Sequence, residues 1–239
     1  MAAPKVLLWD LECSHLDADW GSTLVGGWKW LGESKTHVVS IMDTNPMCAA
    51  CARIEAPADD RELVRRIAEP LRDADAWITW FGHWFDRRFL NTRLLHAQQP
   101  PLPKVFHIDL WKTAHDNLKL SSNRLKNVQG FLGLPAEKTD LKQQMWQDAR
   151  QGGKKGLRYV IEHCRQDVNV LELAYQRLKP YISGGLNLRL FGAARDACPS
   201  CGGQRIRSKG WYCTAERRYR RFECRTCGKS FAARKAEPR

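Results

Sequence analysis

The chain has 239 residues, of which 43% are hydrophobic and 27% charged. This globular composition excludes disorder throughout, and the length suits one ordinary domain and a small module. The formal net charge of +13 favours a polyanionic partner, most simply nucleic acid. No apolar run approaches the roughly 20 residues that a membrane span needs. Asp10 also interrupts the first apolar run before a signal-peptide core forms, so we expect a cytoplasmic protein with no membrane partner.

Short apolar runs alternate with helical patterns along the chain. Runs of this length that end at polar or glycine residues predict buried strands, whereas Leu63, Ile67 and Leu71 recur every fourth residue and predict a helix. In chain order we expect strands over residues 6–9, 24–30 and 36–42, a helix over 59–72, a strand over 76–80, a helix over 85–97, a strand over 105–108, several short helices between 110 and 151, and a long amphipathic helix over 157–178.

This order of elements predicts the fold class and the domains. Strands come first and helices later, with helices between some strands, which favours a mixed α/β sheet flanked by helices. Glycine and serine then break the pattern over residues 183–185, and Gly-Ala-Ala does so over 192–194. We therefore expect a main domain over residues 1–185, a linker over 186–195 and a small domain over 196–239.

Acidic residues occur at three points where the predicted elements can bring them together. Asp10 and Glu12 end the first strand, and residues two apart on a strand point to the same side. Asp86 lies where a strand passes into a helix, and His163 and Asp167 are four apart and share a helix face. Each feature alone is equally typical of a solvated strand end, a helix N-terminus or a surface pair.

Taken together and in this order, these features resemble the RNase H-like superfamily of DEDD exonucleases, which is related to proofreading exonuclease domains. The resemblance is strongest over residues 6–12, 82–96 and 160–178, and it includes stand-alone members from phages and bacteria that carry a zinc ribbon after the exonuclease domain. It implies an RNase H-like fold. It also implies that four carboxylates bind two Mg²⁺ or Mn²⁺ ions, and these are Asp10, Glu12, Asp86 and Asp167.

Position 163 departs from the pattern of this group, where a tyrosine usually stands. His163 could still orient or deprotonate the attacking water, because the unperturbed pKa of histidine suits a general base; a surface histidine is the alternative. Asp109 follows a short strand and could reach the same site, but we expect it to cap the helix that follows it. Trp80, Phe81 and Trp84 either stack on terminal bases or pack in the core.

Two C-x-x-C pairs near the end of the sequence are each followed by glycine and are separated by 22 residues. Such pairs predict one structural Zn²⁺ in a zinc ribbon, and glycine permits the positive φ that these turns need. Cys213 is expected to be a free strand residue, and the separate pair Cys48 and Cys51 lacks a partner pair. The expected zinc ligands are Cys198, Cys201, Cys224 and Cys227.

The stretch between the two cysteine pairs interleaves basic and aromatic residues. Residues 195–239 contain thirteen Lys or Arg and four Asp or Glu, so most of the positive charge lies in this part. Basic side chains bind phosphates and aromatic rings stack on bases, although a charged solubilising face is the alternative. The residues expected to contact nucleic acid are Arg205, Arg207, Lys209, Trp211, Arg217, Arg218, Arg220 and Arg221.

These features predict a metal-dependent 3′→5′ exonuclease that hydrolyses phosphodiester bonds by a two-metal mechanism, with DNA favoured over RNA. The expected partner is a single strand or a 3′ end, which the zinc ribbon helps to bind. An RNase H-like structure-specific endonuclease would use the same carboxylates. In a third reading, the protein binds nucleic acid through the ribbon without catalysis. The sequence gives no indication of the oligomeric state.

Overall fold

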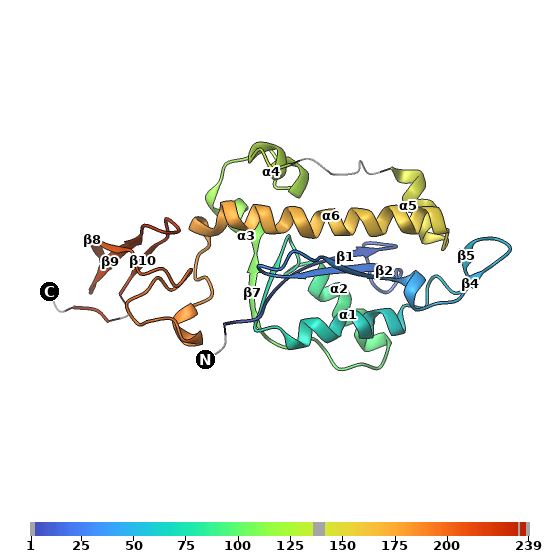
Figure 1. The fold of residues 1–239 in the computed structure, drawn as a ribbon, viewed down its shortest axis with the longest axis horizontal. Coiled ribbons are helices and arrows are strands. Elements are labelled where there is room, and N and C mark those ends of the chain that lie inside the picture. The colour runs from blue at the N-terminus through green and yellow to red at the C-terminus, as the bar shows by residue number, and fades with distance from the viewer. Residues whose placement is uncertain (1–2, 136–141, 234, 238–239) are drawn as a thin grey trace. The chain divides into compact units, whose positions relative to one another are not determined.

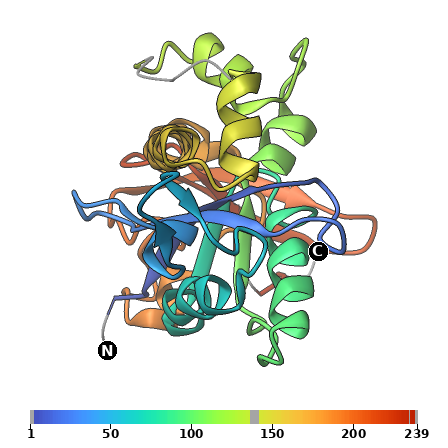
Figure 2. The same ribbon diagram turned by 90° about the vertical axis from the view of Figure 1, so that its right-hand side faces the viewer.

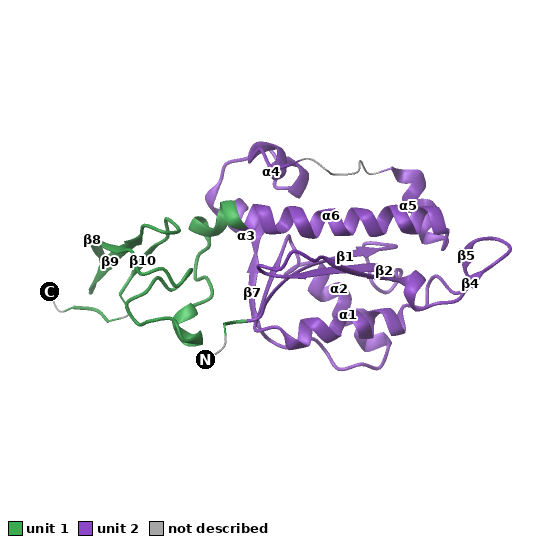
Figure 3. Cartoon of the chain, in the orientation of Figure 1, with its two compact units in different colours: residues 1–4, 176–239 green, residues 5–175 purple. Residues whose placement is uncertain are grey.

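A computed structural model of the protein describes residues 3–135, 142–233 and 235–237. The chain divides into two compact units, one of residues 5–175 and the other of residues 1–4 with 176–239 (Figures 1 and 3). The division falls inside the last long helix, before residue 185, where the sequence analysis ends the first domain. None of the helices in the described ranges combines the length and the apolar character that a membrane crossing requires.

A five-stranded mixed sheet forms the centre of the first unit (Figure 1). Its strand order is β3-β2-β1-β6-β7; β1, β2 and β3 are antiparallel, whereas β1, β6 and β7 are parallel. The predicted mixed α/β fold is thereby confirmed. Strands that are buried on both faces have nearly continuous apolar sequences. Strand β6 is an example, because all of its residues are buried. The strands are β1 (Val6–Cys13), β2 (Thr23–Trp30), β3 (His37–Ser40), β6 (Ala76–Thr79) and β7 (Phe106–Asp109).

Helices cover both faces of this sheet: α6 lies on one face, and α1 and α2 lie on the other (Figures 1 and 2). Short elements complete the unit, including a two-stranded hairpin, β4 (Met47–Cys48) and β5 (Arg53–Ile54), which the sequence did not predict. The helices are α1 (Arg61–Asp73), α2 (Asp86–His96), α3 (Leu110–Asn117), α4 (Leu125–Phe131), α5 (Gln143–Arg150) and α6 (Lys154–Leu178).

Two predicted elements have different bounds in the structure. The strand expected over residues 36–42 is wrong after Ser40, where the 3₁₀ helix η1 (Ile41–Asp43) begins. Asp43 causes this turn, because its Oδ2 accepts hydrogen bonds from the backbone N–H and the hydroxyl of Ser40, at 2.7 and 2.8 Å. Helix α6 begins at Lys154, before the expected residue 157, because Asp148 accepts a hydrogen bond from the Gly156 N–H of its first turn at 2.8 Å.

Adjacent glycines of β2 let helices approach both faces of the sheet closely. A Cβ at Gly26 would lie 2.5 Å from Ile67 of α1, and a Cβ at Gly27 would lie 2.8 Å from Cys164 Sγ and 3.2 Å from Val168, both in α6. Successive strand residues face opposite sides, so the two glycines serve the two helix layers separately. The absence of side chains there brings α6 close to the strands beside it.

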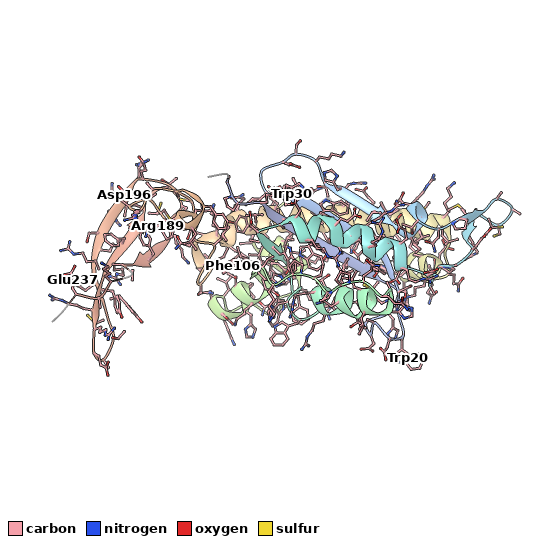
Figure 4. The ribbon with its side chains drawn as sticks, turned by 90° about the horizontal axis from the view of Figure 1, so that it is seen from below. Trp20, Trp30, Phe106, Arg189, Asp196 and Glu237 are labelled. Carbon is pink, nitrogen blue, oxygen red and sulfur yellow. The ribbon has the colours of Figure 1, made fainter. Side chains whose placement is uncertain are left out.

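A buried ion pair connects α1, α2 and the segment between β1 and β2. Arg93 Nη2 lies 2.7 Å from Asp60 Oδ1, and the Asp60 side chain is fully buried. Asp60 Oδ2 also accepts a hydrogen bond from Thr23 N–H at 2.7 Å, and Arg93 Nη1 donates to Ala18 O at 3.0 Å. The segment that this contact fixes carries Trp20, which is 80% exposed and projects outward from the unit (Figure 4).

The second unit holds a three-stranded antiparallel sheet in the order β10-β9-β8. Its strands are β8 (Ile206–Cys213), β9 (Arg218–Cys224) and β10 (Ser230–Ala232). Two 3₁₀ helices, η2 (Lys179–Tyr181) and η3 (Leu188–Phe191), precede them. Apart from a few residues, the side chains of this small sheet are exposed or half-buried, so its hydrophobic core is minimal.

The Gly27 contact predicts the effect of one added methyl group. We expect Gly27→Ala to lower the free energy of unfolding by about 1–3 kcal/mol, because the new Cβ overpacks the α6 contact. Adding Cys164→Ala should restore part of the loss by removing the sulfur. Gly130→Ala is the matched control, since a Cβ there meets nothing within 4 Å; in helix α4 alanine should be neutral or stabilising, by up to about 1 kcal/mol. Urea unfolding measures all four proteins, and equal stability of Gly27→Ala and the wild type would contradict the packing argument.

Candidate functional site

Asp10 and Glu12 lie in the second half of β1, as the alternation of a strand requires. A carboxylate oxygen of each and the sulfur of Cys164 lie within 4.8 Å of one another. Glu12 also lies within this distance of ligand atoms of His163 and Asp167, both in α6. Glu12 is therefore shared between two groups of ligand atoms, one with Asp10 and one with Asp167.

His163 and Asp167 come from consecutive turns of α6, on the side that faces the sheet. His163 is buried, and its Nε2 lies 3.8 Å from Asp167 Oδ2. The shared helix face that the spacing of four predicted is thus present. Because Gly27 brings α6 close to β2, both side chains reach the carboxylates of the neighbouring strand β1.

Asp86 opens α2 immediately after the turn that follows β6, and it is buried. Its Oδ1 accepts a hydrogen bond at 3.2 Å from the backbone N–H of Leu11, the residue between Asp10 and Glu12. Burial raises the pKa of Asp86 to about 7, and repulsion from Asp109 adds to this, while the hydrogen bond from Leu11 opposes it. A bound cation favours the ionised form of such a carboxylate.

The Cys164 sulfur lies within 4.8 Å of carboxylate oxygens of Asp10 and Glu12. Burial raises the pKa of its thiol well above the ordinary value, and so do the negative charges of Asp10, Glu12, Asp167 and Asp86. Its sulfur donates to the backbone oxygen of Asp10 at 3.8 Å. From the sequence, Cys164 belongs only to the apolar stripe of the long helix. That pattern does not reveal that carboxylates lie close to it.

The donor set fits divalent cations. Buried carboxylates that are close enough to repel one another are costly unless a cation compensates them. Several carboxylate oxygens are the ligands that Mg²⁺ and Mn²⁺ prefer, and the grouped ligand atoms of Asp10, Glu12 and Asp167 lie at distances that an ion can bridge. The residues present can therefore hold a hard divalent metal.

Asp109 holds the turn that leads to Asp86. Its side chain accepts hydrogen bonds from Trp111 N–H at 3.0 Å and Lys112 N–H at 3.3 Å, which confirms that it caps the following helix, α3. The same carboxylate also accepts from Phe81 N–H and His83 N–H, both at 3.0 Å. These bonds stabilise Phe81 at a φ of 67°, a conformation that costs a non-glycine residue energy. Sequence reasoning missed this second role, because it joins residues far apart in the chain.

The aromatic residues of this turn divide between packing and exposure. Trp80 is half-buried and its Nε1 donates to Asn123 O at 3.1 Å. Phe81 and Trp84 are 39% and 50% exposed, and the Arg88 guanidinium lies 5.4 Å from the centre of the Trp84 ring. Phe81 and Trp84 thus present ring surface to solvent in the turn that leads to Asp86, whereas Trp80 anchors the turn.

The four cysteines of the two C-x-x-C pairs form a single cluster in the second unit. All four sulfurs lie within 4.8 Å of one another, and Gly202 and Gly228 have φ of 70° and 73°, as the turns require. Burial opposes ionisation of Cys224, but the backbone N–H groups of Cys227 and Thr226 lower its pKa to about 6, which favours the thiolate form that binds metal. The cluster fits a zinc ribbon, and its members are Cys198, Cys201, Cys224 and Cys227.

The other cysteines of interest lie outside this cluster. Cys213 is exposed on β8. Cys48 ends β4, and Cys51 lies in the turn of the β4–β5 hairpin. Within the ranges that the structure describes, none of the three belongs to a group of potential metal ligands.

The structure places the eight predicted nucleic-acid contacts in different environments. Arg207 and Lys209 both pair with Glu223, at 2.6 and 3.1 Å, and Arg220 pairs with Glu237 at 3.1 Å. Trp211 lies under the guanidinium groups of Arg218 and Arg220, 4.4 and 5.4 Å from its ring centre. Arg221 donates to Lys209 O, whereas Arg205 and Arg217 are exposed. Part of the positive charge of the ribbon is therefore neutralised within it.

The model of a protein family described as the RNase_H superfamily matches residues 9–179, a range that contains the second half of β1, the whole of α6 and all four carboxylates. The chain belongs to the RNase H superfamily. Membership of this superfamily supports nuclease activity on nucleic acid, and RNase H-like nucleases use divalent metals.

A comparison with solved structures supports the same fold. The chain is similar to the family B DNA polymerase from the hyperthermophilic archaeon Pyrobaculum calidifontis, with a TM-score of 0.58 and 15% sequence identity. The alignment covers 75% of this chain and 25% of the polymerase, so the RNase H-like chain spans only about a quarter of the polymerase's length. No curated protein matches the chain.

Metal analysis of the purified protein tests the cysteine cluster. We expect about one zinc ion per chain, because four clustered cysteines provide a tetrahedral site, and we expect Cys224→Ser to lose it. Cys213→Ser is the matched control: this cysteine is exposed on the neighbouring strand and lies outside the cluster, so the zinc should remain. Full zinc content in Cys224→Ser, or its absence from the wild type, would contradict the assignment.

Proposed function

We propose that this protein is a metal-dependent 3′→5′ exonuclease that hydrolyses phosphodiester bonds of nucleic acid, with DNA favoured over RNA. The observation that carries the proposal is the grouping of Asp10 and Glu12 of β1 with Asp167 of α6, next to which the Leu11 N–H holds Asp86. The similarity to part of a DNA polymerase agrees with the sequence resemblance to proofreading exonuclease domains. Exposed Phe81 and Trp84 beside this cluster suit the unpaired bases at the end of a strand.

In this proposal the four carboxylates hold two Mg²⁺ or Mn²⁺ ions. When bound, such ions stabilise the charge that develops on the attacking and leaving oxygens of an in-line displacement at phosphorus. The protein's part is to keep the carboxylates in place. The Leu11 N–H holds Asp86, and the α6–Gly27 contact holds Asp167 near Glu12.

We assign His163 to the attacking water. Its imidazole is buried and lies 3.8 Å from Asp167 and within 4.8 Å of a Glu12 oxygen. One ring nitrogen near a carboxylate fixes the orientation of the ring, and a neutral imidazole can orient a water and accept its proton. Position 163 therefore takes the place of the tyrosine that is usual in this group.

The second unit has a supporting role in the proposal. Residues 196–239 form the zinc ribbon, which holds one structural Zn²⁺ through its four clustered cysteines, and residues 186–195 link it to the nuclease domain. The exposed basic residues of the ribbon and the stacked Trp211 bind nucleic acid and raise the affinity for substrate. Catalysis belongs to the first unit, since all four carboxylates lie there.

End-labelled oligonucleotides test the proposal. With Mg²⁺ or Mn²⁺, we expect the wild type to shorten single-stranded DNA stepwise from its 3′ end and to release mononucleotides. EDTA should abolish the reaction. Asp10→Asn should lower kcat by at least about 100-fold, because it removes charge from the site that stabilises the transition state. Labels at the 5′ and at the 3′ end, on DNA and on RNA, identify the direction of cutting and the sugar.

Asp73→Asn serves as the control for loss of one negative charge. Asp73 is exposed and pairs with Lys5, which precedes β1 at the opposite end of the strand from Asp10. The activity of Asp73→Asn should therefore equal that of the wild type. Internal cutting would replace the exonuclease with an endonuclease. Tight binding of nucleic acid without cleavage, whichever metal is added, would indicate a non-catalytic protein that acts through its ribbon. That result would overturn the proposal.

A further inference from the structure

A basic pocket of about 830 Å³ lies in the segment that joins α3 to α4 and along α4 itself. It belongs to the first unit, as the carboxylates do. Among the residues that the structure describes, no aspartate or glutamate lines the pocket, and its basic side chains are accompanied by two serine hydroxyls and a 65% exposed phenylalanine. The lining residues that matter here are Lys119, Ser121, Ser122, Arg124, Lys126 and Phe131.

Two basic side chains of this pocket form no ion pair with a described residue, whereas several basic side chains of the ribbon do. Lys119 and Arg124 are exposed, and neither forms an ion pair with another residue in the described part of the chain. In the ribbon, by contrast, Glu223 is paired with both Arg207 and Lys209. Exposed cations such as Lys119 and Arg124, beside hydroxyl donors, suit the phosphates of a nucleic acid backbone.

A hydrogen bond connects this pocket to the turn that carries Asp86. Trp80 Nε1 donates to the backbone oxygen of Asn123 at 3.1 Å. Asn123 lies between Ser122 and Arg124, which both line the pocket, and Trp80 lies directly before Phe81 in the turn. The pocket is therefore fixed next to the turn and not elsewhere on the unit.

Exposed rings lie along the same path. Phe81 contacts Trp111 of α3 edge-to-face, with 4.9 Å between ring centres, and Trp111 stacks on His115 at 4.9 Å. Helix α3 leads from this aromatic group to Lys119, and Phe131 exposes its ring at the pocket. Aromatic rings stack on bases that are unpaired, which favours a single strand over a duplex.

We propose that the basic pocket of α4 binds the sugar-phosphate backbone of single-stranded nucleic acid and guides the strand, over the exposed rings, to the carboxylate site. This inference rests on the proposed function, because it takes the strand to be the substrate. It assigns substrate binding within the nuclease unit to Lys119 and Arg124, in addition to the basic residues of the ribbon.

Salt dependence of binding provides the first test, on the full chain with Asp10→Asn added to prevent cleavage. For a single strand, the slope of log affinity against log salt falls by about 0.7 for each phosphate contact removed. We expect the double change Lys119→Ala and Arg124→Ala to lower the slope by about 1.4 and to weaken binding of a long single strand of DNA. An unchanged slope would overturn the inference, and a loss confined to duplex DNA would show that the partner is wrong.

Lys35→Ala with Lys104→Ala is the control that removes the same charge. Both lysines are exposed, and both lie at the end of the sheet away from the carboxylates. Lys104 precedes the start of β7, and Lys35 follows the end of β2, where Trp30 pairs with Leu7 near the start of β1. This control should keep the wild-type salt slope. If the slope falls equally in both double variants, the effect comes from the net charge of the protein and not from the pocket. That result would overturn the inference.

Cleavage of short and long substrates separates this inference from the proposed function. With Asp10 intact, Lys119→Ala with Arg124→Ala should raise KM for a long single strand and leave kcat/KM for a dinucleotide unchanged, because a dinucleotide engages the carboxylates without the pocket. Equal losses on both substrates would place the two residues in the catalytic site and contradict a guiding role. If the wild type cleaves neither substrate, the proposed function fails, and the binding experiment still decides whether the pocket holds a single strand.

Discussion

The mutual repulsion of four carboxylates around one buried thiol is the constraint on which the rest of this structure depends. Asp10 and Glu12 come from β1, Asp86 from the start of α2 and Asp167 from α6, and all four raise the pKa of Cys164. Burial, with repulsion from Asp109, raises the pKa of Asp86 to about 7. Holding such groups together is unfavourable unless a divalent cation binds them, so the fold supplies stability elsewhere in order to maintain a site of this kind.

That stability comes from contacts around the site that have no chemistry of their own. Gly27 has no side chain, so α6 can pack closely on the sheet at this position. This close packing determines how near Asp167 comes to β1. On the other face, the buried pair of Asp60 and Arg93 ties two helices to the strand and segment that follow Glu12. Asp109 fixes the strained turn at Phe81 that introduces Asp86. Each contact limits the freedom of one carboxylate-bearing element.

Local patterns in the sequence predict most of the fold, and long-range pairings account for what they miss. Alternation in β1 places Asp10 and Glu12 on one side, the spacing of four places His163 with Asp167, and the two C-x-x-C pairs indicate the cysteine cluster, which the structure shows. No local pattern reveals that Asp109 bonds the turn at Phe81, that Glu223 and Glu237 neutralise ribbon arginines, or that Cys164 lies among the carboxylates. The end of β3 at Ser40 also depends on Asp43, whose carboxylate accepts a hydrogen bond from the Ser40 N–H. The apolar pattern of the strand does not reveal this bond.

The measurement that tests the account most directly is anomalous diffraction from crystals of the protein soaked in Mn²⁺, collected for the wild type and for Asp10→Asn. The account predicts manganese peaks bounded by Asp10, Glu12, Asp86 and Asp167 in the wild type, about 4 Å apart if two ions bind, with at least one peak lost in the variant. Clear manganese sites elsewhere in the crystal, with none among these four carboxylates, would contradict the claim that they form a metal centre.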